Sequence, residues 1–251
     1  DFDIIFGDDG IVKYQVVSGE VTIDSRNTGQ GRLPSGDYRL LEILSVEGGT
    51  AGDDILGSGI GDDILIGGLG NDQLRSGEGN DVLIGDSGRI LFNSGHRSLI
   101  ESTDSFNQGG TNDLLSGGDG ANYLIGGLGN DEILTGFTDP DEFSLILGDL
   151  GQINFEYDAS TGINSVTGML SSYPGIGGDD EISSNGSSDW IIAGLGSDQV
   201  SIPTGAFLSL GIGALSPIFN NSVQYLEWSV LNSLEDSTGG SLILMNGFNL
   251  E

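Results

Sequence analysis

Aspartates recur at nine-residue intervals in three parts of this 251-residue chain. Most of them follow a glycine by two positions and precede an apolar residue by two, as in the copy Gly67-Gly68-Leu69-Gly70-Asn71-Asp72-Gln73-Leu74-Arg75. The repeats contain no sulfur or imidazole, so they offer a metal only the hard oxygens of carboxylates and backbone carbonyls. Six to eight such oxygens at about 2.4 Å suit Ca²⁺, whereas Mg²⁺ demands a stricter octahedron. The predicted cofactor is calcium, as several ions, and the predicted ligands are Asp54, Asp63, Asp72, Asp81, Asp113, Asp131, Asp180, Asp189 and Asp198.

The nine-residue spacing also predicts the elements that hold these aspartates. Six glycine-rich residues can turn tightly, using backbone angles that only glycine adopts cheaply. Three residues around a central Leu, Ile or Val then form a short strand with one inward side chain. Two such units close one coil, so Asp54 is expected to stack on Asp72, and Asp63 on Asp81. A column of carboxylates about 4.8 Å apart is unstable unless cations lie between them.

These copies resemble the glycine-rich nonapeptide of the repeats-in-toxin, or hemolysin-type, calcium-binding family, over residues 48–84, 108–134 and 175–201. The resemblance implies an all-β fold, a right-handed parallel β-roll or β-solenoid with calcium between successive turns and the repeat aspartates as ligands. Two copies depart from the pattern, because Asn122 replaces the aspartate and Thr111 replaces the glycine before Asp113. Calcium sites that use those loops are expected to be weaker or absent.

Composition narrows the possible partners. The chain has 38 acidic and 7 basic residues, for a formal net charge of −31, so it would repel nucleic-acid phosphates and anionic lipid surfaces. It has no cysteine, and no apolar run approaches the roughly 18 residues of a membrane span. A secreted chain without disulfides needs another cross-link, and metal can supply it. Since the sequence opens at Asp1 without an initiator Met, we expect a piece of a longer extracellular protein, loose without calcium.

The nine-residue repeats are interrupted by insertions. Three similar phrases, residues 4–12, 82–90 and 145–153, share a Gly-Asp-x-Gly exit, after which apolar and polar residues alternate. That alternation predicts inserted β-hairpins, for example Ile153–Tyr157 with Ile163–Val166, and Tyr14–Val17 with Glu20–Ile23. The expected organisation is the end of a preceding unit plus a hairpin (1–47), a roll block with its insertion (48–107), a roll block with its hairpin (108–173), a third roll block (174–201) and an atypical C-terminal β-rich cap or assembly segment (202–251).

The two sheets of the predicted roll differ on their outer faces. One carries polar residues such as Gln73 and Glu132, and should face water. The other is apolar on both faces and must be covered, either by the hairpins and C-terminal segment of this chain or by a neighbouring chain in a fibre or sheet. Leu145 and Leu147 belong to the outward apolar residues of this sheet if Phe137–Pro140 is a four-residue insertion in the repeat. The outward residues of this apolar sheet are Ile64, Ile66, Val82, Ile84, Tyr123, Ile125, Trp190 and Ile192, and we expect Tyr123 and Trp190 to be substantially buried.

Beyond Ile202 the aspartates stop and the chain becomes apolar. Residues 207–210 fit a degenerate roll strand. The spacing of Phe219, Val223, Leu226 and Val230 would suit a helix, whereas the β-rich composition and the turn at 237–240 favour a hairpin. An atypical unit is expected at the end of a solenoid, where it protects unpaired strand edges.

No catalytic site is predicted. The single histidine, His96, falls between inserted strands, and no metalloprotease, nucleophile-elbow or Walker motif occurs. Adjacent acids such as Asp53 and Asp54 recur at every turn, where calcium would keep them ionised, so they do not fit a glycosidase acid–base pair. The predicted function is a non-enzymatic calcium-binding structural module that folds on binding extracellular Ca²⁺ and assembles with itself or with neighbouring units into a fibre, sheet or stalk. The alternatives are the stalk of a calcium-dependent adhesin, or the C-terminal export module of a secreted protease or lipase.

Overall fold

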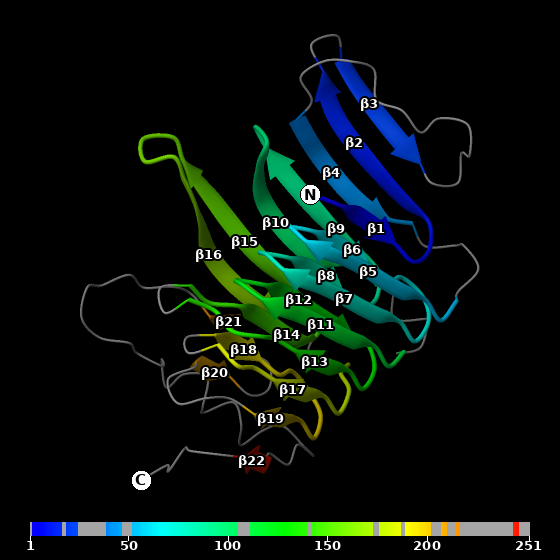
Figure 1. The fold of residues 1–251 in the computed structure, drawn as a ribbon, viewed down its shortest axis with the longest axis vertical. Helices are drawn as coiled ribbons and strands as arrows, with labels where there is room; N and C mark the ends of the chain where they lie inside the picture. The colour runs from blue at the N-terminus through cyan, green and yellow to red at the C-terminus, as the bar shows by residue number, and fades with distance from the viewer. Residues whose placement is uncertain are drawn as a thin grey trace.

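The computed structural model describes residues 2–16, 19–24, 39–46, 52–104, 111–139, 142–172, 176–186 and 189–201, together with the backbone of three short strands at 207–209, 214–215 and 243–245. Every regular element in these ranges is a β-strand, and no helix in them could cross a membrane. The strands form two seven-stranded parallel sheets and one eight-stranded antiparallel sheet (Figure 1). The predicted all-β class and parallel, roll-like architecture are thereby confirmed.

The chain alternates between the two parallel sheets, as the nine-residue period predicts. The first, termed the covered sheet, consists of β1 (Ile4–Phe6), β6 (Ile64–Ile66), β8 (Val82–Ile84), β12 (Tyr123–Gly127), β14 (Leu145–Asp149), β18 (Trp190–Ile192) and β20 (Phe207–Ser209). The second, termed the open sheet, consists of β5 (Ile55–Ile60), β7 (Gln73–Glu78), β11 (Leu114–Asp119), β13 (Glu132–Leu134), β17 (Glu181–Ser183), β19 (Gln199–Ser201) and β22 (Ile243–Met245).

In the strands whose side chains the structure describes, the central apolar residue points between these two sheets. Leu65 and Leu83 from the covered sheet, and Leu74 and Leu115 from the open sheet, are fully buried in one common cluster. Tyr123 pairs with Leu145, 22 positions later, so four extra residues precede β14, as the Phe137–Pro140 insertion predicts. The strand predicted at 207–210 is also present, as β20 beside β18.

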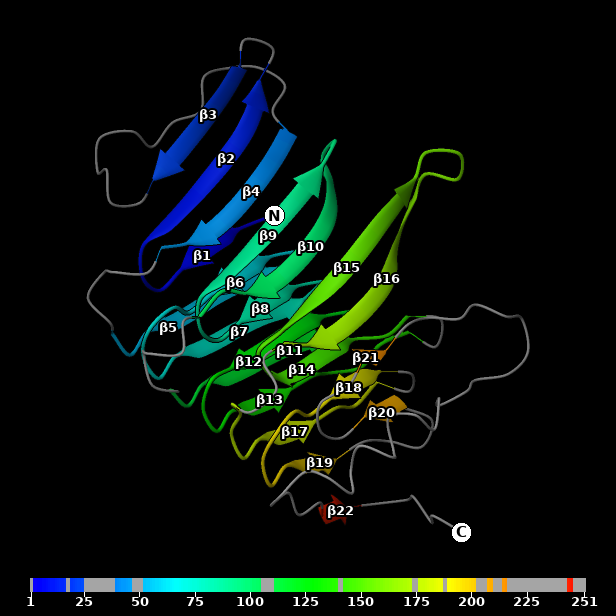
Figure 2. The same cartoon turned by 180° about the vertical axis from the view of Figure 1, so that it is seen from behind.

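The inserted segments form the antiparallel sheet, termed the covering sheet (Figure 2). The hairpins of residues 14–23 and 153–166 are confirmed, with Tyr14 opposite Val21 and Phe155 opposite Val166. β4 (Arg39–Ser45) is not predicted from the sequence, yet it pairs with both β2 (Gly10–Val16) and β9 (Gly88–Asn93) and so joins the first insertion to the second. The pairing of β10 (His96–Ser102) with β15 (Gly151–Asp158) adds the third insertion to the same sheet. The strands of this sheet are β2 (Gly10–Val16), β3 (Gly19–Asp24), β4 (Arg39–Ser45), β9 (Gly88–Asn93), β10 (His96–Ser102), β15 (Gly151–Asp158), β16 (Ile163–Ser171) and β21 (Ala214–Leu215).

The covering sheet buries the outer face of the covered sheet within this one chain. Ile64, Ile66, Val82, Ile84, Ile125 and Ile192 are each at most 1% exposed, in a second core cluster with residues such as Ile100 and Ile153. Tyr123 and Trp190 pack against this cluster but are only partly buried, at its margin beside Phe155 and Phe143. The open sheet keeps Gln73, Glu132 and Gln199 exposed to solvent, as predicted.

The three insertions that the structure describes all leave the roll in the loop that connects the covered sheet to the open sheet. They follow β1, β8 and β14 of the covered sheet and return before β5, β11 and β17 of the open sheet. One side of the roll therefore carries the connections of these three insertions to the covering sheet. The helix or hairpin considered for residues 216–240 lies outside the described residues.

Candidate metal centre

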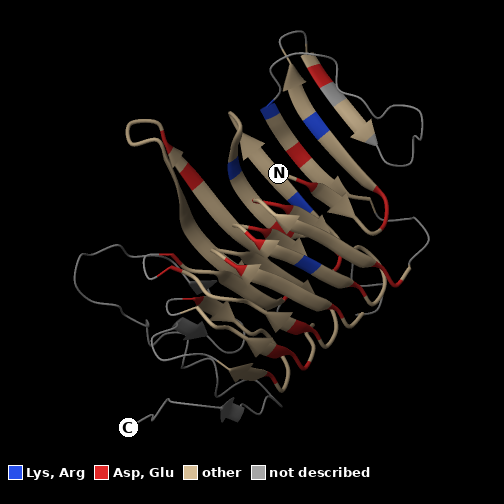
Figure 3. Cartoon of the chain, viewed as in Figure 1, with Lys and Arg blue, Asp and Glu red and all other residues tan. Residues whose placement is uncertain are grey.

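The loops between the two parallel sheets stack into two columns. The first column, on the side where the insertions leave, places Asp54, Asp72, Asp113, Asp131, Asp180 and Asp198 one above another. The second column, on the opposite side, places Asp3, Asp63, Asp81, Asn122, Ser144 and Asp189 one above another. All nine predicted ligands thus fall into two rows of acidic loops at the strand ends (Figure 3). The expected stacking of Asp54 on Asp72, and of Asp63 on Asp81, is present.

The nine-residue count misses two members of the second column. Asp3 precedes the inward Ile5 by two positions, and Ser144 precedes the inward Ile146 by two. Both could have been found from the local Asp-x-apolar or Ser-x-apolar pattern. Asp3 was missed because no complete copy surrounds it, and Ser144 because the four-residue insertion shifts the count.

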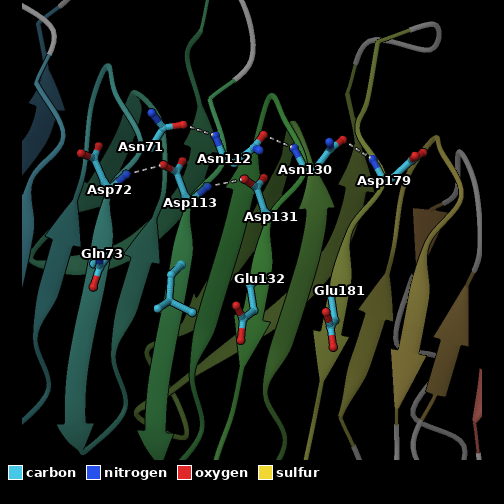
Figure 4. A pocket seen from close by; sticks show the side chains of 11 residues that line it. Asn71, Asp72, Gln73, Asn112, Asp113, Asn130, Asp131, Glu132, Asp179 and Glu181 are labelled. Carbon is cyan, nitrogen blue, oxygen red and sulfur yellow. Dashed lines mark hydrogen bonds between the residues drawn. The ribbon is translucent and has the colours of Figure 1, made fainter.

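Within the first column, a ladder of hydrogen bonds fixes one oxygen of every carboxylate after Asp54. The backbone N–H of Asp72 donates to Oδ1 of Asp113 at 2.8 Å, and the N–H of Asp113 donates to Oδ1 of Asp131 at 2.8 Å (Figure 4). The same bond links Asp131 to Asp180 at 2.9 Å. Each carboxylate is therefore held in one orientation by the preceding turn, which leaves its second oxygen directed into the loop.

That second oxygen is buried and has no hydrogen-bond partner in six of the ten aspartates of the two columns. An unpaired buried charge costs several kcal/mol unless a counter-charge is supplied, because it has lost its hydration. The Oδ2 atoms concerned belong to Asp63, Asp72, Asp81, Asp113, Asp131 and Asp180, whose side chains are at most 3% exposed.

Each of these first-column oxygens lies beside a backbone carbonyl in a cradle formed by glycine. A Cβ added at Gly126 would collide with Oδ2 of Asp131 and with the carbonyl oxygen of Gly148 in the next turn. The same convergence occurs at Gly67, with Oδ2 of Asp72 and the carbonyl of Gly85. A carboxylate oxygen, with its full negative charge, and a carbonyl oxygen, with its partial one, therefore face the same space beside each glycine. A larger side chain at the glycine position would fill that space. This arrangement fits a hard cation such as Ca²⁺.

The electrostatics of the metal-free chain point the same way. Burial, opposed by one backbone hydrogen bond and reinforced by neighbouring carboxylates, raises the pKa of Asp113 to about 8 and that of Asp180 to about 8. Burial, then the charge of Asp180, also raises the pKa of Asp131 well above its ordinary value. A carboxylate desolvated in this way must either take up a proton or gain a cation. A metal that neutralises the column would keep these groups ionised.

The ligand set must include backbone oxygens. Among the described residues, no three His, Asp or Glu side chains are placed to hold a metal by themselves. The model for the RTX calcium-binding nonapeptide repeat matches the chain in four copies, at residues 48–74, 57–89, 108–138 and 175–201. This chain carries RTX calcium-binding repeats. A search of curated proteins found no match to it.

A second, exposed ladder runs beside the RTX aspartates and was not predicted. It uses the residue before each first-column aspartate, and its bonds run in the opposite direction. The N–H of Asn112 donates to Oδ1 of Asn71 at 3.0 Å, and the N–H of Asn130 donates to Oδ1 of Asn112 at 2.9 Å (Figure 4). Asp179 continues the series at 2.7 Å. The amides of Asn71, Asn112 and Asn130 tie the central turns together without adding charge, whereas the series begins and continues with the acidic Asp53 and Asp179.

In the second and third Gly-Asp-x-Gly exits, the aspartate bridges the two parts of an RTX loop that an insertion divides, a role that the sequence did not reveal. The Asp149 carboxylate accepts the N–H of Gly178, where the chain returns to the roll, and the N–H of Leu195 in the next loop. Asp86 accepts from Thr111 Oγ1 at the corresponding point of return, and from the N–H of Leu128. Burial raises the pKa of Asp149 to about 7. The recurrence of the exit phrase was a signal, but the partners lie 25–46 residues away.

His96 lies outside both RTX columns. It begins β10 in the covering sheet and stacks on Tyr157, with ring centroids 3.4 Å apart. Its place at a turn between inserted strands matches the prediction from sequence.

Proposed function

We propose that this chain is a calcium-binding structural module of a secreted or cell-surface protein, and that extracellular Ca²⁺ folds it. At the low calcium concentrations inside a cell the columns of carboxylates would repel one another, and the chain would stay loose. At the 10⁻⁴–10⁻³ M calcium affinities typical of extracellular modules, ions would enter between the turns and close the roll, which we take to be right-handed as in the repeat family. The repeat aspartates then serve as scaffold, and no catalytic role is assigned to them.

One observation carries this proposal. In successive turns a carboxylate oxygen is buried without a partner, beside a carbonyl oxygen and a glycine that leaves room for an ion. Enzymatic carboxylates occur as one or two in a cleft, with different environments. Here the same buried environment surrounds the carboxylates of successive turns from Asp72 to Asp180, as expected if each turn binds a metal ion for structural reasons.

The direct test is far-UV circular dichroism of metal-stripped protein titrated with Ca²⁺ and, separately, with Mg²⁺. We expect a cooperative gain of β signal at sub-millimolar to millimolar calcium and little change with magnesium. A chain that is already fully folded without metal and does not respond to calcium would refute the proposal. A response of equal size to both ions would retain the metal switch but refute the assignment to calcium.

We favour a fibre, sheet or stalk over an export module because the insertions are joined by a repeated contact. The N–H of Gly88 donates to Ser45 Oγ at 2.8 Å, and the N–H of Gly151 donates to Ser102 Oγ at 2.9 Å. Each bond links the base of one insertion to the start of the next. Such units can be added in series, which suits a stalk, including that of an adhesin. Sedimentation velocity with and without calcium would test self-association.

A further inference from the structure

The two columns of RTX loops satisfy their buried oxygens differently. In the first column, the Oδ2 atoms of Asp72, Asp113, Asp131 and Asp180 have no partner. In the C-terminal half of the second column, the corresponding groups are satisfied by hydrogen-bond donors of the chain itself, which belong either to the residue at that position or to neighbouring hydroxyls. These positions are Asn122, Ser144 and Asp189, all fully buried.

At Asn122 one side-chain amide takes the place of both the carboxylate oxygen and the cation. Its oxygen accepts the hydrogen bond that an aspartate would accept, and its NH₂ group contacts the carbonyls that a cation would contact. Its Oδ1 accepts the N–H of Asp81 at 2.9 Å, which fixes the orientation of the amide group. Its Nδ2 then donates to the carbonyl oxygens of Gly118 and Gly120 at 3.1 and 3.2 Å. A Cβ added at Gly117 would meet this Nδ2, just as one at Gly126 would meet Oδ2 of Asp131. The amide N–H groups therefore point at loop carbonyls of the kind that a calcium ion would need.

Asp189 follows the nine-residue spacing but is satisfied by hydroxyl groups. Its Oδ1 accepts the N–H of Ser144 at 2.7 Å, and its Oδ2 accepts the hydroxyls of Ser184 at 2.5 Å and Thr135 at 3.4 Å. Ser184 stands five residues before Asp189, at the position that glycine holds before Asp72 and Asp131. Ser76 has the same position before Asp81 and lies beside its carboxyl, but the hydroxyl donates to the carbonyl of Gly117 at 2.9 Å, and Oδ2 of Asp81 is buried without a hydrogen-bond partner.

Ser144 completes the series without any carboxylate. Its hydroxyl oxygen accepts the N–H of Asn122 at 3.1 Å, in the place of an aspartate Oδ1. The hydroxyl donates to the carbonyl of Gly120 at 3.4 Å. Three consecutive loops of this column thus close with donors of the chain itself.

We propose that the loops of Asn122, Ser144 and Asp189 are calcium-independent locks, and that calcium enters the first column and the N-terminal loops of the second. This inference rests on the proposed calcium function and specifies which side of the roll depends on the ion. It also removes Asp189 from the ligands that the nine-residue spacing predicts. The roll would then be held metal-free on one side of its C-terminal half and by calcium on the other.

The test counts calcium ions per chain, by equilibrium dialysis at saturating calcium followed by elemental analysis. Asp180→Asn and Asp189→Asn form a matched pair, because the two residues are nine positions apart and each substitution removes one charge. We expect Asp180→Asn to lose at least one ion and Asp189→Asn to lose none. Asn122→Asp, which restores the carboxylate, should gain about one ion.

The outcomes separate this inference from the proposed function. Wild-type protein that binds no calcium would overturn both. Wild-type protein that binds several ions, with Asp189→Asn losing one or a folded Asn122→Asp variant gaining none, would overturn only the assignment of calcium-independent loops. If Asn122→Asp does not fold, as judged by its circular dichroism at saturating calcium, the comparison of Asp180→Asn with Asp189→Asn decides the question alone.

Discussion

The calcium-free chain should lose stability as the pH rises from about 4 to about 8. The pKa values of Asp113 and Asp180 are about 8 in the folded roll, against an ordinary value of 3.8. Between these values the folded state binds more protons than the unfolded state, so the free energy of unfolding falls as pH rises. About four pH units for each carboxyl, at 1.36 kcal/mol per unit, give a loss on the order of 10 kcal/mol. A loss of that size is comparable to the whole stability of a typical domain, about 5–15 kcal/mol.

The assay is far-UV circular dichroism of metal-stripped protein across this pH range, with and without millimolar calcium. Without calcium, we expect β structure near pH 4.5 and a loose chain near pH 8. With calcium, the aspartates stay ionised and bound, so the β signal should persist at neutral pH. Calcium should bind less well toward pH 5, because protons compete for the same oxygens.

A matched pair of variants separates these buried carboxyls from the general repulsion of an acidic chain. Asp180→Asn and Glu156→Gln each remove one negative charge, but Glu156 is exposed in the covering sheet. Asp180→Asn should stabilise the calcium-free roll at pH 7–8, since the amide can still accept the N–H of Asp131. Glu156→Gln should change little. Equal effects of both variants, or a metal-free roll as stable at pH 8 as at pH 4.5, would refute the reasoning.

Three further substitutions test separate parts of the structure. Gly126→Ala should fill a calcium cradle and raise the calcium midpoint at least tenfold in a circular dichroism titration, whereas Gly57→Ala, whose Cβ would meet only one atom at 3.8 Å, should leave that midpoint unchanged. Asp149→Ala should cost about 2–4 kcal/mol in calcium-bound denaturant unfolding because one buried and one partly buried N–H group lose their acceptor, while the exposed Asp139→Ala should cost under 0.5 kcal/mol. Leu83→Ala should cost about 2–5 kcal/mol by the same measurement, because its side chain is fully buried between the parallel sheets, and a cost below 1 kcal/mol would contradict that packing.

The sequence by itself determined the roll and the acidic columns. An aspartate every nine residues, with an inward leucine two positions later, encodes both a short strand and the loop before it. These are local relations, since each unit contacts the adjacent turn in the same way. Asp72 and Leu74 could therefore be placed without knowledge of the rest of the chain. The outer apolar face was also predictable, because Ile64 and Ile66 flank an inward residue on the covered sheet.

Only the tertiary structure decided what covers that face and how the loops are satisfied. β4 pairs with β9, and β10 pairs with β15, and these pairings between separate insertions turn the hairpins into one covering sheet. The clasp formed by Asp149 and the hydroxyl partners of Asp189 likewise join residues from different turns. Nine-residue spacing gives Asp180 and Asp189 the same expected role, yet one has an unpartnered buried oxygen and the other does not. The difference arises because a buried oxygen is satisfied by the groups that surround it in space, and spacing along the chain does not specify those groups.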